Sequence, residues 1–206
     1  MDPSQLERIV NQSDIVEVLK TWAYARDRGD WNALANCFHP EATIHISWIS
    51  DTASAFVAGS KRMLSEIKPG EHSKHNLGSS RVIVNGNRAV SECHVELLRR
   101  VCSHETYFDT HTWGRFLDLF EKREDGLWRI FKRTMVYEKD RLDAVDPSQL
   151  PVDFWKCMDL NQFPPACRFL CYRLSISGRE PVSNIVTVYS NAERDLLQEQ
   201  DTWLEQ

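Results

Sequence analysis

The sequence predicts an α+β fold: a cone-shaped barrel in which a curved, mostly antiparallel sheet wraps over N-terminal helices, followed by a C-terminal extension. Three observations predict it. Helical periodicity marks the start of the chain, long alternating strands fill the middle, and prolines interrupt the segment after about residue 140. Because helices that precede antiparallel strands cover one face of the sheet, we expect a closed and mostly apolar pocket between the two layers.

The first part of the chain is expected to contain three helices and one strand. Apolar residues recur at helical spacing from Ile15 to Ala23, which indicates an amphipathic helix. Gly29 ends this helix, and Asp30 can begin the next one because its side chain can cap the first turn. The expected helices cover residues 1–27, 30–38 and 59–67, and the expected strand covers residues 42–49.

Beyond Arg81 the pattern changes to long strands joined as hairpins. Asn85-Gly86-Asn87 is a strong hairpin turn, and the strand that follows alternates regularly. One face of that strand carries Ala89, Ser91, Cys93, Val95 and Leu97, and His94 lies on the other face. In the last strand, alternation places Arg133 and Met135 on one face and Ile130 and Val136 on the other. The expected strands cover residues 81–84, 88–100, 107–120 and 126–137.

The chain divides into a domain of residues 1–140 and an extension of residues 141–206. Prolines break up the extension, and residues 192–204 can form a final helix. The extension is too short and too discontinuous for a second domain. We therefore expect it to pack on the core or on a neighbouring subunit.

Composition excludes several classes of protein. The 206 residues carry 42% hydrophobic side chains, 27% charged side chains and a net charge of −5, which argues against a nucleic-acid partner. No run is apolar enough for a membrane span, and the N-terminus is too polar for a signal peptide. The six cysteines form no CxxC pair, so free thiols and a cytoplasmic location are expected. No glycine loop, HExxH or GxSxG occurs, so we expect no metal and no cofactor.

Several residues could carry acid–base chemistry. Asp27 on the covering helix and His75 at the mouth of the sheet could form a hydrogen-bonded dyad in which the histidine removes a proton. An inward-facing Arg133 could stabilise a developing oxyanion, and His94 and Tyr107 are further candidates. Each residue also has a structural explanation: a helix-capping aspartate, a strand or loop histidine, or an ion-paired arginine. Aromatic residues that could bind a flat, hydrophobic substrate are Trp22, Tyr24, Trp48, Phe56 and Trp113.

A series of motifs resembles the SnoaL-like superfamily, which has a cystatin-like α+β cone. The resemblance covers roughly residues 5 to 140 and implies the fold more specifically than the function. The motifs that carry it are Tyr24-x-x-Asp27-x-x-Asp30-Trp31, Phe38-His39-Pro40-Glu41-Ala42, His75-Asn76-x-Gly78, Val84-Asn85-Gly86-Asn87-Arg88-Ala89, Gly114-Arg115-Phe116 and the segment from Asp125 to Arg133.

Two enzymes of that superfamily are similar in the residues that matter. In the resemblance to scytalone dehydratase, the catalytic aspartate falls on Asp27 and the two histidines fall on His75 and His94. The tyrosine that precedes that aspartate is replaced by Arg26, so another tyrosine such as Tyr24 or Tyr107 would have to substitute. In the resemblance to hexachlorocyclohexane dehydrochlorinase, the aspartate, histidine and arginine of the site fall on Asp27, His75 and Arg133.

The residues and the resemblance together favour a cofactor-independent acid–base lyase or isomerase. It would be dehydratase-like and act on a small polyketide-like or polycyclic substrate of secondary metabolism. One alternative is a cyclase or skeletal-rearrangement isomerase that uses the same dyad. The other, from a different class, is a non-catalytic ligand-binding or interaction module. A homodimer or homotrimer is expected, because an uncovered sheet face would be a large apolar patch.

Overall fold

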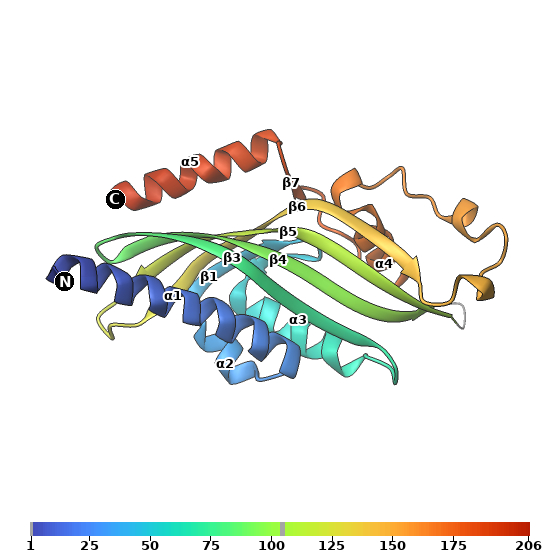
Figure 1. Cartoon of the computed structure of the whole chain (residues 1–206), viewed down its shortest axis with the longest axis horizontal. Coiled ribbons are helices and arrows are strands. Elements are labelled where there is room, and N and C mark those ends of the chain that lie inside the picture. The colour runs from blue at the N-terminus through green and yellow to red at the C-terminus, as the bar shows by residue number, and fades with distance from the viewer. Residues whose placement is uncertain (1, 104–105) are drawn as a thin grey trace.

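The computed structural model describes residues 2–103 and 106–206 and has the predicted α+β architecture. Three helices precede most of the sheet and pack against one of its faces (Figure 1). We call this the inner face, and the opposite one the outer face. The helices are α1 (Pro3–Arg28), α2 (Trp31–Asn36) and α3 (Ala53–Ser65), and the C-terminal part adds α4 (Arg168–Ile176) and α5 (Asn191–Glu205).

The sheet is curved and mostly antiparallel, and it does not close into a complete barrel. The strand order along the sheet is β2-β1-β6-β5-β4-β3, and β7 pairs with β6 beside this path. The pairs β1–β6 and β6–β7 are parallel. The strands are β1 (Phe38–Ile46), β2 (Ile49–Thr52), β3 (His72–Asn85), β4 (Arg88–Ser103), β5 (Thr106–Lys122), β6 (Trp128–Ala144) and β7 (Val186–Thr187).

The junction between α1 and α2 determines where Asp27 can point. Gly29 ends α1 with a φ of +76°, a left-handed conformation that favours glycine. Asp30 then caps α2, because its side chain accepts a hydrogen bond from the backbone N–H of Ala33 at 3.0 Å. Since Asp30 caps the next helix, Asp27 is free to bond elsewhere.

An aromatic cluster joins the helices to the inner face of the sheet. The ring of Trp22 on α1 stacks on Phe56 of α3, with 6.1 Å between the ring centroids. The same indole meets Phe116 of β5 edge-on at 5.1 Å. All three side chains are buried, so they hold α1 and α3 at fixed positions over the strands.

A β-bulge in β6 changes which residues face the core. Phe120 pairs with Ile130 and Leu119 pairs with Lys132, so Phe131 has no partner in the ladder. Ile130 therefore lies in the same inner core as Met135, and the expectation that alternation separates them was wrong. Phe131 instead packs on the outer face.

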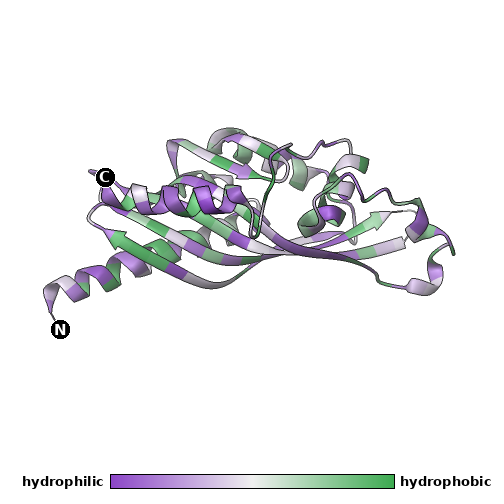
Figure 2. Ribbon diagram, turned by 90° about the horizontal axis from the view of Figure 1, so that it is seen from above, coloured by the Kyte–Doolittle hydropathy of each residue, from purple (hydrophilic) through white to green (hydrophobic). Residues whose placement is uncertain are grey.

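The C-terminal extension packs on both faces of its own sheet. β6 continues to Ala144, across the expected boundary at residue 140. Leu170 and Leu174 of α4 join the inner core, whereas Trp203 of α5 packs against Val90 and Leu119 on the outer face. Figure 2 shows that hydrophilic residues predominate along α5, in agreement with a helix that covers the sheet with one side and meets solvent with the other.

Polar contacts fasten α5 to the strands. The side-chain amide of Gln200 donates a hydrogen bond to the carbonyl oxygen of Ser91 at 3.0 Å. The indole N–H of Trp203 donates one to the carbonyl oxygen of Phe120 at 3.1 Å. Glu193 pairs with Arg115 of β5. The chain thus covers much of its own outer face.

Two further findings concern the sequence predictions. No helix in the described part of the chain is both long and apolar enough to span a membrane. All six cysteines are described, and each is a free thiol.

Candidate functional site

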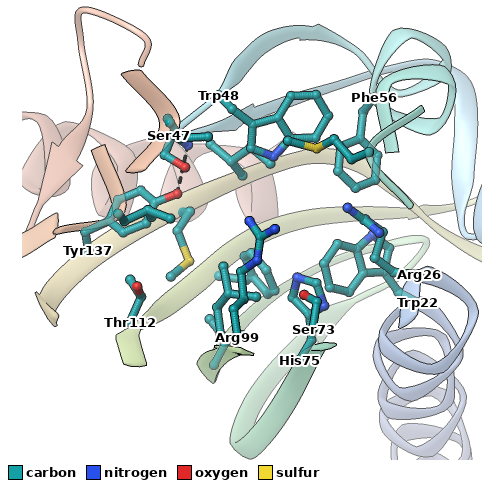
Figure 3. A pocket seen from close by; sticks show the side chains of 18 of the residues that line it. Trp22, Arg26, Ser47, Trp48, Phe56, Ser73, His75, Arg99, Thr112 and Tyr137 are labelled. Carbon is teal, nitrogen blue, oxygen red and sulfur yellow. Dashed lines mark hydrogen bonds between the residues drawn. The ribbon is translucent and has the colours of Figure 1, made fainter. Parts of the chain in front are cut away.

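A cavity of about 80 Å³ lies between the inner face of the sheet and the helices α1, α3 and α4 (Figure 3). Its apolar walls come from all of these elements, and its polar groups come mainly from the strands. The apolar lining includes Trp22, Trp48, Phe56, Met63, Leu97, Phe116, Leu170 and Leu174, and the polar lining includes Arg26, Ser47, Ser73, His75, Arg99, Thr112 and Tyr137.

Asp27 and His75 form a hydrogen-bonded pair beside this cavity. The ring Nδ1 of His75 lies 2.6 Å from Oδ1 of Asp27, and the backbone N–H of His75 donates to Oδ2 at 2.8 Å. Their side chains are only 12% and 19% exposed. Because both carboxylate oxygens are engaged by one residue, the aspartate holds the imidazole and its backbone in a fixed orientation.

The surroundings keep the imidazole neutral near neutral pH. Burial lowers the pKa of His75 below its usual 6.5, the hydrogen bond and charge of Asp27 oppose this, and Arg26 and Arg99 lower it further. The carboxylate beside Nδ1 favours the tautomer that carries its proton there. Nε2 then keeps its lone pair, and no hydrogen-bond partner for it occurs among the described residues. This arrangement suits a general base.

Tyr137 supplies a hydroxyl on another wall of the cavity. Its Oη accepts a hydrogen bond from the backbone N–H of Ser47 at 2.8 Å, so its own proton remains available to a ligand (Figure 3). Burial raises the pKa of Tyr137 well above its usual range, which keeps the phenol protonated. Tyr137 can therefore donate a hydrogen bond to a developing negative charge.

Two arginines that the sequence analysis did not assign to the site also line the cavity. Arg99 extends from β4 into it, and Arg26 lies on α1 directly before Asp27 (Figure 3). Burial lowers the pKa of Arg26 to about 10 and also lowers that of Arg99. Guanidinium groups are strong enough bases to stay protonated in proteins, so we treat both side chains as cations. Alternation along β4 could have revealed Arg99, because it continues the inward series that ends at Val95 and Leu97.

The sequence comparison identifies the family. Residues 7–134 match the model of the SnoaL-like domain. The chain belongs to the SnoaL-like family. One relative is pea pathogenicity protein 2 of Fusarium vanettenii, 31% identical over 175 residues that cover 83% of this chain and 70% of the relative. An uncharacterized protein of Aspergillus terreus is 30% identical over 173 residues, which are 76% of this chain and 62% of that protein.

Solved structures agree with the SnoaL-like assignment at the level of the fold. A Novosphingobium aromaticivorans protein described as a scytalone dehydratase superposes with a TM-score of 0.56 at 14% identity, over 69% of this chain and 96% of that one. A hexachlorocyclohexane dehydrochlorinase gives a TM-score of 0.57 at 14% identity, over 71% of this chain and 97% of that one. At such low identities the likeness shows the fold alone.

In this SnoaL-like chain Arg133 does not line the cavity. Its side chain is fully buried and forms two hydrogen bonds with Asp118 of β5, at 2.7 and 2.8 Å. Its guanidinium lies over the rings of Trp22 and Phe116, which separate it from the cavity that they line. The expectation that Arg133 faces the substrate was wrong, because Asp118 holds it deeper in the core.

Four other candidates also lie away from the cavity. His94 is exposed on the outer face, as the alternation around Cys93 and Val95 requires. Trp113 lies on the outer face, where its indole N–H donates to Glu96 at 3.1 Å. The hydroxyl of Tyr107 donates to the carbonyl of Pro69 at 3.3 Å, and Tyr24 is 62% exposed. By contrast, Trp22, Trp48 and Phe56 do line the cavity.

Proposed function

We propose that this protein is a cofactor-independent lyase or isomerase in which His75 is the general base and Asp27 orients it. The observation that carries the proposal is the 2.6 Å contact between Nδ1 of His75 and Oδ1 of Asp27 at the wall of a largely apolar cavity. The family assignment supports it, since dehydratase and dehydrochlorinase folds are among the structural neighbours.

The proposed chemistry begins with proton transfer. Nε2 of His75 takes a proton from a carbon next to a carbonyl group, and the electron pair of the C–H bond moves to the carbonyl oxygen as an enolate. Tyr137, in place of the buried Arg133, donates a hydrogen bond that stabilises that oxyanion. Imidazolium then returns the proton either to another carbon, which isomerises the substrate, or to a departing β-hydroxyl, which leaves as water.

The cavity limits the size of the substrate. Its volume of about 80 Å³ is roughly half of the about 150 Å³ of a cavity that accepts benzene. A compact carbonyl compound with a single ring, such as a small polyketide-like metabolite, needs a modest displacement of flexible lining side chains such as Met63 and Arg99. A polycyclic substrate would need a larger opening.

The test is exchange of α-protons in D₂O, followed by ¹H NMR on cyclohexanone, 2-cyclohexenone and 3-hydroxycyclohexanone. The wild-type protein should accelerate exchange or elimination on at least one of them. His75→Ala should lose about 10²–10⁴-fold in rate, because a positioned base contributes that much. His94→Ala is the matched control and should retain the wild-type rate, since His94 is exposed on the outer face.

Two results would count against the proposal. An equal rate for His75→Ala and wild type would remove the base from the mechanism. Absence of any acceleration with these three neutral ketones and with a carboxylate-bearing ketone, 3-oxocyclohexanecarboxylate, would favour the non-catalytic binding module instead.

A further inference from the structure

We infer that the substrate carries a carboxylate, which Arg99 binds together with Arg26 at the wall of the cavity. This inference rests on the proposed function, because it names the class of substrate that the same site takes. It starts from three arginines on different elements. Arg26 of α1 and Arg99 of β4 line the cavity, and the charge of Arg99 also acts on Arg173 of α4.

None of these three arginines has an ion-pair partner in the described part of the chain, unlike Arg100, Arg115 and Arg133. The Nε atoms of Arg99 and Arg173 are buried without a hydrogen-bond partner among the described residues. A buried guanidinium without a counter-charge is costly, so the cluster favours an anion.

The two acidic groups nearest the cluster are already engaged. Both oxygens of Asp27 bond to His75. Glu71 accepts from the backbone N–H groups of Lys68 at 2.9 Å and Cys102 at 3.0 Å. Asp27 and Glu71 still act electrostatically on these arginines. Three guanidinium groups against two carboxylates nevertheless leave one net positive charge beside the cavity.

Repulsion between the arginines contributes to lowering their pKa values. Burial, with a contribution from Arg99, lowers the pKa of Arg173 to about 9. Arg99 in turn lowers the pKa of Arg26 and of His75. The charge of Arg99 thus acts on both other arginines, as expected for groups that share one bound anion.

The strand register relates this anion site to His75. His75 of β3 pairs with Leu97 of β4, and Ser73 pairs with Arg99. His75 and Arg99 are therefore diagonal neighbours on the inner face, about 7–8 Å apart at their backbones. A carboxylate held in the planar fork of Arg99 leaves the adjoining carbons of a compact substrate in front of His75.

Figure 3 shows the Arg99 side chain reaching into the cavity between Tyr137 on one side and Trp22 and Arg26 on the other. The carboxylate would sit at this guanidinium, and the carbon skeleton would lie against the aromatic wall.

Isothermal titration calorimetry with benzoate and its neutral analogue benzamide tests the inference without requiring turnover. The wild-type protein should bind benzoate at least about tenfold more tightly, because a charge-assisted hydrogen bond contributes at least that factor. The affinity for benzoate should fall as salt is added, and that for benzamide should not.

Substitutions of single arginines show which side chain causes the preference for benzoate over benzamide. We define the preference as the affinity for benzoate divided by the affinity for benzamide. Arg99→Gln should reduce this ratio to about one, and Arg99→Lys should retain part of the preference. Arg100→Gln is the matched control. Arg100 follows Arg99 directly, is exposed and pairs with Asp109 on the outer face, so the variant should show the same preference as the wild-type protein. If Arg99→Gln does not fold, as judged by circular dichroism, Arg173→Gln provides the second test and should lower the preference by a smaller factor.

The outcomes separate this inference from the proposed function. Equal affinity for the two probes, binding of neither, or an equal loss in Arg100→Gln would overturn the carboxylate site. His75→Ala should keep the preference for benzoate. If it does while proton exchange proves independent of His75, the proposed catalysis fails and the anion site remains.

Discussion

Replacement of Asp118 by alanine should leave Arg133 as an unpaired charge in the core. Both side chains have 0% exposure, and the variant loses the two Arg133–Asp118 hydrogen bonds of 2.7 and 2.8 Å. Ser91 also loses an acceptor at 3.1 Å, and Nη1 of Arg133 has no partner among the described residues even in the wild type.

The expected loss in the free energy of unfolding is about 3–5 kcal/mol, the cost of removing one partner from a buried ion pair. The rings of Trp22 and Phe116 against the guanidinium offset a part of it, about 2 kcal/mol at most. We therefore expect a value near 3 kcal/mol, a large share of the roughly 5–15 kcal/mol that stabilises a typical domain.

Urea denaturation followed by circular dichroism measures this loss through the transition midpoint and slope. Asp109→Ala is the matched control, because its pair with Arg100 is 45% and 49% exposed and should contribute less than about 1 kcal/mol. The double variant Asp118→Ala/Arg133→Met should be more stable than Asp118→Ala alone, since methionine removes the stranded charge. A loss below about 1 kcal/mol in Asp118→Ala, or a double variant no more stable than the single one, would refute the reasoning.

Two further predictions concern the pH dependence of stability and the close contact at Gly114. Burial holds the pKa of folded His75 below 6.5, so the unfolded chain binds the proton more readily. The unfolding free energy should therefore fall on acidification below about pH 6.5, by at most about 1.4 kcal/mol per pH unit, and His75→Gln should lack this part. If urea titrations show a constant difference in unfolding free energy between wild type and His75→Gln from pH 7 to pH 5, the prediction is wrong. Gly114→Ala should cost about 1–3 kcal/mol in the same assay, because the new Cβ would overlap the Val136 carbonyl and lie 2.6 Å from Met135 Cε. Gly78→Ala, whose Cβ would lie 3.2 Å from His94, should cost less, and equal losses would count against the overlap.

Much of the fold was predictable because it follows from local patterns. Helical spacing around Trp22, the capping residue Asp30 and the hairpin turn at Gly86 each determine structure within a few residues. The meeting of Asp27 with His75 was also expected, since one was placed on the covering helix and the other at the mouth of the sheet. The structure places His75 within β3, which begins at His72 and not at the expected residue 81.

The orientation of the other candidates depends on strand register, which motif similarity does not reveal. His94 and Trp113 lie one residue away from inward positions, so a reading by alternation alone places them on the outer face. Ile130 could not be placed in this way, because the bulge at Phe131 interrupts the alternation. The burial of Arg133 follows from its pairing with Asp118 on the neighbouring strand, a long-range contact that no local pattern indicates.

The role of Arg26 and Arg99 in the cavity could not be predicted from the sequence for a different reason. A pair such as Arg99-Arg100 resembles an ordinary solvated end of a strand. Alternation indicates that Arg99 turns inward, but only the tertiary fold shows that it meets a cavity while Arg100 pairs with Asp109. Neither Arg26 nor Arg99 has an ion-pair partner within residues 2–103 and 106–206, and such an absence becomes visible only when the surrounding residues are in place.

The cavity wall is drawn from two parts of the chain that are far apart in sequence. The Asp27–His75 pair lies within the matched family segment, residues 7–134, whereas Leu170 and Leu174 lie beyond it on α4. The Asp27–His75 pair and this part of the cavity wall therefore belong to separate segments, and a change in one need not alter the other during evolution. Under the proposed function, an exchange of residues 168–176 between homologues should change which ligand fits and leave the Asp27–His75 pair in place.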